Sequence, residues 1–167
     1  MRADDAPAVL EAFRGAGMDR QGEVTTPDQA REWVGRMLPG EEDRVVFAID
    51  VDGTMVGCIG IGPIDRANRT GWFWYWTRED QRGRGLTSRA AATAATWALT
   101  DGGLDRLELG HRANNPESGG VARAAGFVQE GVERGKFLVE GVRVDVLTYG
   151  RLATDPAPTV APLPVDR

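Results

Sequence analysis

The strongest chemical signal in the chain is a short run rich in glycine and arginine, Gln81-Arg82-Gly83-Arg84-Gly85-Leu86-Thr87. Glycines allow backbone N–H groups to turn toward a ligand because no Cβ atom stands in the way. The alanine-rich segment that follows predicts a helix, whose N-terminus would present unpaired N–H donors and the positive end of its dipole. With the guanidinium groups of Arg82 and Arg84, these features predict a pyrophosphate-binding loop. The alternative is a tight solvated turn that carries two incidental arginines.

Other nucleotide-binding and metal-binding patterns fit the chain less well. The P-loop pattern G-x-x-x-x-G-K-[S/T] is absent, and a dinucleotide fingerprint would need a third glycine where Ser88 stands. The single cysteine, Cys58, excludes an internal disulfide and a thiolate metal site. The single histidine, His111, argues against a histidine-rich centre. We therefore expect no metal.

A second polar cluster, Asn115-Pro116-Glu117-Ser118, has the pattern of a helix start. An Asn side chain accepts a backbone N–H at the N-cap position, and Pro suits the first helical position. Local structure alone therefore explains why Asn115 and Ser118 stand where they do, and a functional role needs separate evidence.

The remaining pattern predicts a mixed α/β fold in which antiparallel strands come first and strand–helix units follow. Thr26 and Gln29 form a capping box around Pro27, and Asp52-Gly53 marks a two-residue hairpin turn. We expect helices over residues 6–15, 87–100 and 115–126, and one from Pro27 that Pro39 and Gly40 end. We expect strands over residues 45–51, 54–61, 70–77, 104–110, from 127, 136–139 and 142–149.

Size, charge and composition limit the classes of protein that the chain can represent. The 167 residues suit one domain, which we place at residues 1–152, followed by a Pro-rich, disordered or extended tail over 153–167 that holds four of the nine prolines. The net charge of −5, from 20 basic and 25 acidic residues, argues against a nucleic-acid partner. No apolar run is long enough for a membrane span and no signal peptide is recognisable, so we expect a cytoplasmic protein without a membrane partner.

Two motifs together resemble a known family. The pattern Arg82-x-x-Gly85-x-Thr87 resembles the R-x-x-G-x-G/A acyl-CoA motif of the GNAT N-acetyltransferases, with Thr87 in place of the last small residue. Downstream, the segments 114–118 and 125–131 resemble the N-x-x-S … G-F-x-x-E-G block that is typical of the RimJ/RimL-like branch, the type of the ribosomal-protein-alanine acetyltransferases. The resemblance runs from about Val45 to Leu152.

This resemblance implies a fold and a cofactor. The fold would be α/β (α+β), a GNAT-like mixed, mostly antiparallel twisted sheet with a central splayed parallel pair, flanked by about four helices. The co-substrate would be acetyl-CoA, with no metal. The implied cofactor-binding residues are Trp76 and Thr77 on a strand, Gln81, Arg82, Gly83, Arg84, Gly85, Leu86 and Thr87 in the loop, and Asn115 and Ser118 at the later helix start.

The resemblance also implies a reaction, the direct attack of a primary amine on the thioester. Ser118 would be the catalytic acid of this branch, because Ala122 stands where many family members carry a tyrosine. The family's usual glutamate base is missing, which leaves Glu133, Asp145 or a water chain as alternatives. His111 follows a strand near the expected cleft. The branch often carries Glu where this chain has Arg89.

Several alternatives stay open from the sequence. The acceptor is an amine on a small molecule or on a protein N-terminus, and a homodimer is possible in this fold. The chain could instead be a non-catalytic acyl-CoA-binding or sensor module, or a transferase that uses another acyl-CoA such as succinyl-CoA.

Overall fold

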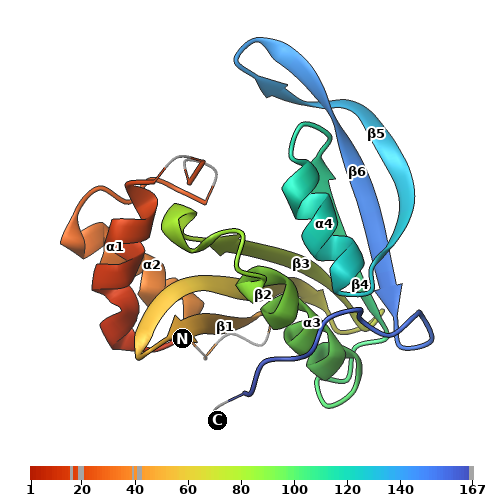
Figure 1. Cartoon of the computed structure of the whole chain (residues 1–167), viewed down its shortest axis with the longest axis horizontal. Coiled ribbons are helices and arrows are strands. Elements are labelled where there is room, and N and C mark those ends of the chain that lie inside the picture. Colours follow the sequence, from red (N-terminus) through yellow and green to blue (C-terminus); the bar gives the residue numbers. More distant parts are fainter. Residues whose placement is uncertain (16, 19–20, 39, 41–42, 166–167) are drawn as a thin grey trace. The chain divides into compact units, whose positions relative to one another are not determined.

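A computed structural model describes residues 1–15, 17–18, 21–38, 40 and 43–165 of the chain. The helices in this part are α1 (Ala6–Phe13), α2 (Pro27–Met37), α3 (Leu86–Leu99) and α4 (Pro116–Ala124), with short 3-10 helices η1 (Ala3–Asp5) and η2 (Glu79–Gln81). The strands are β1 (Val45–Val51), β2 (Thr54–Asp65), β3 (Thr70–Thr77), β4 (Arg106–Arg112), β5 (Val128–Val139) and β6 (Val142–Leu152). They form a six-stranded sheet in the order β1-β2-β3-β4-β6-β5 (Figure 1).

The first two strands form the predicted hairpin. Val51 pairs with Thr54, so only Asp52 and Gly53 lie in the turn. Both have positive φ angles, 52° and 81°, which is the backbone twist that a two-residue hairpin requires. The Asp50 carboxylate closes the turn by accepting the Gly53 N–H at 2.8 Å. β2 then continues four residues beyond the predicted end at Ile61.

The parallel pair lies in the middle of the strand order. β3 pairs with β4 in parallel over Thr70–Trp72 and Arg106–Glu108, while β4 with β6 and β5 with β6 are antiparallel. The parallel pairing covers three residues of each strand, although β3 continues to Thr77 and β4 to Arg112. The expected mostly antiparallel sheet with a central parallel pair and four helices is confirmed.

The last hairpin differs from the sequence reading. One strand, β5, runs continuously where two separate strands were expected. An irregularity between Glu133 and Phe137 makes this possible, because Gly135 has a left-handed φ of 58° and its N–H donates to the Asp145 carboxylate on β6 at 2.7 Å. The interruption is therefore a bulge within one strand rather than a loop.

Backbone contacts divide the chain into two compact units. The first comprises residues 1–62 and 74–87, and the second comprises residues 63–73 and 88–167. The core of the first unit contains the rings of Phe13, Trp33 and Trp76, which meet edge to face with centroids 5.6 to 6.2 Å apart. Cys58 is fully buried in the same core, and burial raises the pKa of its thiol well above the usual value.

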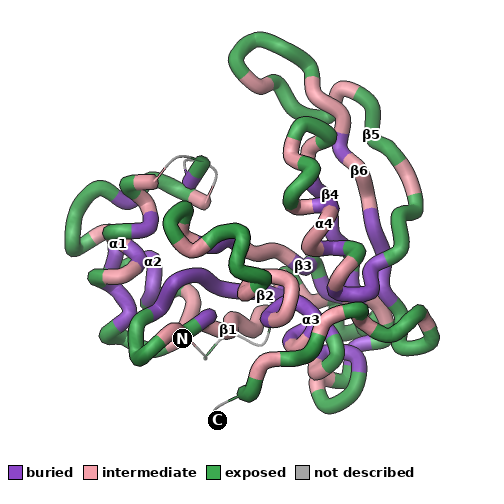
Figure 2. The backbone as a smooth tube through the Cα atoms, viewed as in Figure 1, coloured by how far each residue is buried: buried purple, intermediate pink, exposed green. Residues whose placement is uncertain are grey.

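The core of the second unit lies against β4 and β6. Leu107, Leu109 and His111 alternate along β4 as its buried positions, and Tyr149 of β6 is 1% exposed. The rings of Phe73 and Phe127 pack with centroids 5.1 Å apart. Small residues form the buried side of α3 (Figure 2), namely Ala90, Ala91, Ala92, Ala94, Ala95 and Ala98.

The C-terminal residues 153–165 contain no helix or strand, and none of them is buried. They are nevertheless bonded to the second unit. The Thr159 N–H donates to the Ala124 carbonyl at 3.1 Å, Arg89 donates to the Ala161 carbonyl at 3.1 Å, and the Leu163 N–H donates to the Thr93 hydroxyl at 2.8 Å. The tail thus follows α3 as an extended segment (Figure 1).

Candidate functional site

The glycine- and arginine-rich loop connects η2 to the start of α3. Gly83 and Gly85 both have φ angles of +73°, a left-handed conformation that favours glycine. A Cβ atom built on either glycine would meet no heavy atom within 4 Å, so the space beside both backbones is open. Both residues are exposed and directly precede the 14-residue helix α3. An open loop at a helix N-terminus fits an anionic ligand such as a pyrophosphate.

The loop is anchored at both ends within the first unit. The hydroxyls of Thr77 and Thr87 share a hydrogen bond of 2.6 Å that joins the end of β3 to the first turn of α3. Arg82 donates from Nε to the Thr77 carbonyl at 3.1 Å, and Arg84 donates to the Gln81 side chain. These bonds hold the loop while leaving both arginines exposed. Thr87 therefore serves as an anchor at the position where the family usually has Gly or Ala.

Trp76 lies in a different environment from the other residues that are expected to bind the cofactor. Its side chain is 6% exposed and packs against Phe13 and Trp33. Its indole Nε1 is buried without a hydrogen-bond partner. The side chain is thus a core group, and any contact of Trp76 with a cofactor would come from its backbone.

Asn115 and Ser118 lie together in the second unit, at the start of α4. Asn115 is the N-cap, and its Oδ1 accepts the Ser118 N–H at 3.3 Å. Ser118 is half-buried in the first turn of the helix, and Ala122 is fully buried one turn later. The structure brings the loop residues 76–87 together in one unit and these two residues together in the other.

The two carboxylates considered as bases both have partners. Glu133 forms an ion pair with Lys136 at 2.6 Å and is exposed. Asp145 accepts the Gly135 N–H, as described above. Each carboxylate therefore has a role in the structure of the β5–β6 hairpin.

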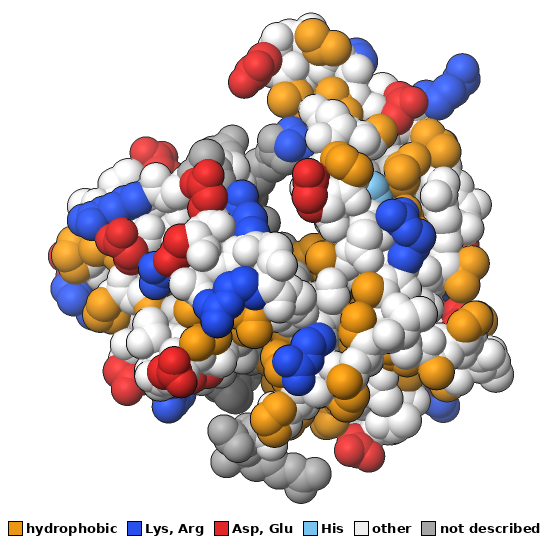
Figure 3. All heavy atoms as spheres, viewed as in Figure 1, with side chains coloured by type: hydrophobic (Ala, Val, Ile, Leu, Met, Phe, Trp, Pro, Cys, Tyr) orange, Lys and Arg blue, Asp and Glu red, His pale blue; other side chains and the backbone are white. Residues whose placement is uncertain are grey.

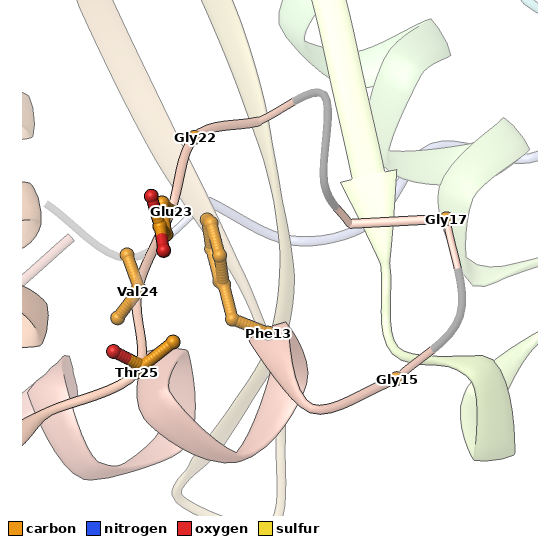
Figure 4. A pocket seen from close by; sticks show the side chains of 7 residues that line it. All are labelled: Phe13, Gly15, Gly17, Gly22, Glu23, Val24 and Thr25. Carbon is orange, nitrogen blue, oxygen red and sulfur yellow. The ribbon is translucent and has the colours of Figure 1, made fainter.

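A pocket of about 610 Å³ lies in the first unit, beside the loop between α1 and α2 (Figure 4). Its side chains include the Phe13 ring and the exposed Glu23 carboxylate, with Val24 and Thr25 alongside. An aromatic ring and a carboxylate suit a cationic group. The sequence reading did not identify these residues, because nothing in their local pattern distinguishes them from an ordinary loop.

The sequence places His111 just after a strand that ends at Gly110, near the expected cleft, whereas in the structure it lies within β4. The structure gives it a buried ring and hydrogen bonds to two other residues of the second unit. The signal that could have found it is its position, because it occupies the third buried place on β4 after Leu107 and Leu109, where a polar side chain requires partners.

Within the described residues, no group of three or more His, Cys, Asp or Glu side chains could hold a metal ion. None of the described helices has the length and apolar character needed to cross a bilayer.

Comparisons with known proteins agree with this geometry. Residues 1–128 match the acetyltransferase (GNAT) domain family. The chain is 28% identical over 134 residues, 80% of its length and 70% of the relative's, to a Bacillus subtilis (strain 168) protein named "Putative ribosomal N-acetyltransferase YdaF". It is 29% identical over 107 residues, 64% of its length and 60% of the relative's, to the ribosomal-protein-serine acetyltransferase of Escherichia coli (strain K12).

Solved structures show the same fold. RimL, a ribosomal L7/L12 alpha-N-protein acetyltransferase in complex with coenzyme A, superposes with a TM-score of 0.80 at 22% identity, covering 91% of this chain and 90% of that one. The self-immunity acetyltransferase MccE, in complex with acetyl-CoA and AMP, gives 0.79 at 18% identity over 90% and 88% of the two chains. With the family match over three quarters of its length, the chain belongs to the GNAT acetyltransferases, in their RimJ/RimL-like branch, and is an acetyl-CoA-dependent N-acetyltransferase.

Proposed function

We propose that this enzyme acetylates the N-terminal amine of a protein, with Ser118 as its general acid. The observation that supports the acceptor is that the two relatives above are both named for the acetylation of ribosomal proteins. The observation that supports the site is the open loop at the start of α3. A ribosomal acceptor also implies a cytoplasmic setting.

The loop residues would bind the pyrophosphate of acetyl-CoA. The backbone N–H groups at Gly83 and Gly85 and the first turn of α3 supply uncharged donors, and the dipole of α3 adds a positive field. Arg82 and Arg84 would add charge-assisted bonds from their exposed guanidinium groups. Gln81, Leu86 and Thr87 complete the loop, with Thr77 and the Trp76 backbone at the strand side. This arrangement positions the thioester, and positioning is the main source of rate in a direct transfer.

Ser118 would protonate the thiolate that leaves when the amine attacks the thioester. Its place in the first turn of α4 puts its hydroxyl near the positive end of the helix dipole, which also stabilises a developing thiolate. Asn115 would hold this turn and bond the pantetheine arm. Because Glu133 and Asp145 are engaged within the β5–β6 hairpin, we assign removal of the amine proton to water rather than to a carboxylate.

The pocket beside the α1–α2 loop is our candidate for acceptor recognition. The attacking amine arrives as an ammonium ion at neutral pH, and Glu23 with the Phe13 ring would attract that charge before the proton is lost. In this proposal the acceptor needs one accessible amine that can reach the pocket.

A homodimer stays a prediction. The last strand in the sheet order, β5, and its hairpin partner carry the exposed apolar side chains Val128, Val132, Phe137, Leu138 and Val142. This is the surface that a second copy would cover, and light scattering on the purified protein tests it.

The acceptor proposal is tested with a panel of amines. Peptides that begin with Ser or Ala, the same peptides with a blocked N-terminus, and the polyamine spermidine are each incubated with the enzyme and acetyl-CoA. Mass spectrometry should find one acetyl group on the free peptides and none on the blocked ones. Preferential acetylation of spermidine would contradict the protein acceptor. Binding of acetyl-CoA without transfer to any amine would favour the sensor alternative.

A further inference from the structure

A buried polar cluster surrounds His111 on the side of β4 that α4 covers. The imidazole is 6% exposed and its ring lies 5.3 Å from the Tyr149 ring, stacked with an interplanar angle of 28°. Gly119 of α4 passes directly over it, since a Cβ on this glycine would lie 2.7 Å from His111 Nε2. Only glycine therefore allows α4 to approach the ring so closely.

The hydrogen bonds of this cluster determine which ring nitrogen carries the proton. His111 Nδ1 lies 2.9 Å from the Arg112 carbonyl oxygen. A carbonyl can only accept, so Nδ1 carries the hydrogen and Nε2 presents its lone pair. The Tyr149 hydroxyl lies 3.3 Å from Nε2 and 3.5 Å from Gln129 Oε1, and the shorter of these two contacts makes it the donor to Nε2. Arg123 of α4 in turn donates to the Tyr149 oxygen at 3.4 Å.

The same carbonyl also holds the turn that begins α4. The Asn115 N–H donates to the Arg112 carbonyl oxygen at 2.9 Å, so this atom accepts from both the imidazole and Asn115. Asn115 Oδ1 then accepts the Ser118 N–H. Three hydrogen bonds thus lead from the buried ring to the backbone of Ser118.

We infer that His111 is a positioning residue of the transfer reaction: its Nδ1–H bond to the Arg112 carbonyl fixes the turn that presents Asn115 and Ser118. This inference rests on the proposed role of Ser118 as the acid. The tyrosine holds the ring from the other side, so that Nδ1 stays directed at the carbonyl. A small displacement of a proton donor is costly in rate, which gives such a support functional weight.

The surroundings favour a neutral ring. Burial, and then the positive charge of Arg123, lower the pKa of His111 below its usual value of 6.5. The charged or titratable side chains that the structure places against the ring are Arg123 from α4 and Tyr149 from β6, while Arg112 contributes its backbone carbonyl. Protonation of Nε2 would put an N–H against the Tyr149 hydroxyl and a second cation near Arg123.

Two substitutions of His111 distinguish the contribution of Nδ1 from that of Nε2. In His111→Asn the side-chain amide can occupy the place of Nδ1 and keep the bond to the Arg112 carbonyl. In His111→Gln the amide reaches the place of Nε2 and the Nδ1 bond is lost. We expect kcat for acetyl transfer to fall about tenfold in His111→Gln and to stay within about twofold of wild type in His111→Asn. Calorimetric affinity for CoA should change little in either.

Tyr149→Phe is a more conservative variant that can be used if both His111 variants fail to fold. It keeps the stacked ring and the Nδ1 bond. It removes the hydroxyl that donates to Nε2, which is also the acceptor of the Arg123 N–H and a neighbour of Gln129 Oε1. We expect kcat to fall by less than in His111→Gln, at a temperature where thermal melts show each variant to be folded. Equal losses of kcat in His111→Asn and His111→Gln, or losses that follow the unfolded fraction alone, would overturn the inference and leave a purely structural cluster.

A double-variant comparison distinguishes this inference from the role of Ser118. If His111 acts through Ser118, adding His111→Gln to Ser118→Ala should reduce kcat no further. Wild-type kcat in Ser118→Ala would overturn the proposed acid. A slow Ser118→Ala beside a wild-type His111→Gln would overturn the positioning inference alone.

Discussion

At the residue scale, Ser118 has either a structural role at the start of α4 or the proposed role of general acid, and one substitution distinguishes the two. The serine has a sufficient structural explanation, since it stands in the first turn of α4 where Asn115 caps its N–H. Ser118→Ala leaves that cap in place, so the free energy of unfolding should change by less than about 1 kcal/mol. As the proton donor to the leaving thiolate, however, its loss should lower kcat by about 10²-fold with little change in CoA affinity.

The matched control for this variant is Ser118→Thr, which keeps a hydroxyl at the same place. It should retain most of the activity that Ser118→Ala loses. A loss of CoA affinity in proportion to kcat would instead make Ser118 a binding residue.

The neutral state of His111 predicts a pH dependence of stability. Because its pKa in the folded protein is lowered from 6.5, the unfolded chain binds the proton more readily. The contribution of this residue is therefore fully present above about pH 6.5 and is lost as the pH falls from there toward the lower folded pKa. Urea unfolding at a series of pH values should show this decline in wild type and a smaller one in His111→Asn. Parallel curves for the two proteins would show that the ring does not titrate in this way.

Some of the candidate residues can be predicted from the sequence and others cannot, for a physical reason. The glycines and arginines of the loop are candidates from the sequence because their spacing and the helix that follows are local features. The burial of the Trp76 side chain on β3 depends on Phe13 of α1 and Trp33 of α2, which lie far from it in the sequence. The role of His111 depends on Tyr149, 38 residues away in the chain, and no local pattern records such a partner.

At the scale of elements, the loop before α3 is the part on which we propose that cofactor binding depends. Replacing Arg82 and Arg84 with Ala removes two cationic donors from an exposed loop whose backbone is also anchored by the Thr77–Thr87 bond. We expect the binding free energy of acetyl-CoA to weaken by about 2–6 kcal/mol in calorimetry, from roughly 1–3 kcal/mol for each of the two charged contacts.

A double variant on α2 controls for the change in net charge. Arg31→Ala with Arg36→Ala removes the same two charges from exposed ion pairs with Asp28 and Glu32. Its acetyl-CoA affinity should equal that of wild type. An equal loss in both double variants would mean that the loop is only a turn and that the effect is one of overall charge.

Elements with local signals were predicted well, and those shaped by tertiary contacts were not. The capping box of Thr26 and Gln29 starts α2 as expected, and the Asp52-Gly53 turn sets the first hairpin. By contrast, β5 could be recognised as one strand only through the bond from Gly135 to Asp145 on the neighbouring strand. Sequence patterns carry capping and turn chemistry, whereas a bulge needs its partner strand.

At the scale of the whole molecule, the proline-rich tail contributes more than its composition suggests. From composition alone, deletion of residues 156–167 is expected to leave stability nearly unchanged. The bonds from the tail to Arg89, Thr93 and Ala124 change this expectation. At about 0.5–1.5 kcal/mol for each of these three bonds, the deletion should lower the free energy of unfolding by about 1.5–4.5 kcal/mol.

Thr93→Val provides the intermediate variant, because it removes the hydroxyl that bonds the Leu163 backbone while the tail stays present. Its melting temperature should lie between those of wild type and the deletion. Identical melting temperatures for all three proteins would show that the tail adds no stability in solution.

The charged side chains on the surface of the molecule are of both signs. The chain has a net charge of −5. On the face shown in Figure 3, basic and acidic side chains are interspersed, with no basic stripe.

The central claim, that this chain transfers acetyl from acetyl-CoA to an amine, is tested most directly by following both products in one reaction. The purified protein is mixed with acetyl-CoA and a peptide with a free N-terminal Ser, and free CoA thiol and acetylated peptide are measured over time. We predict equal amounts of the two products, no product from the blocked peptide, and a strongly reduced rate in the Arg82→Ala, Arg84→Ala variant. If neither product appears with any amine while acetyl-CoA binds, or if thiol appears without acetylated amine, the claim is contradicted.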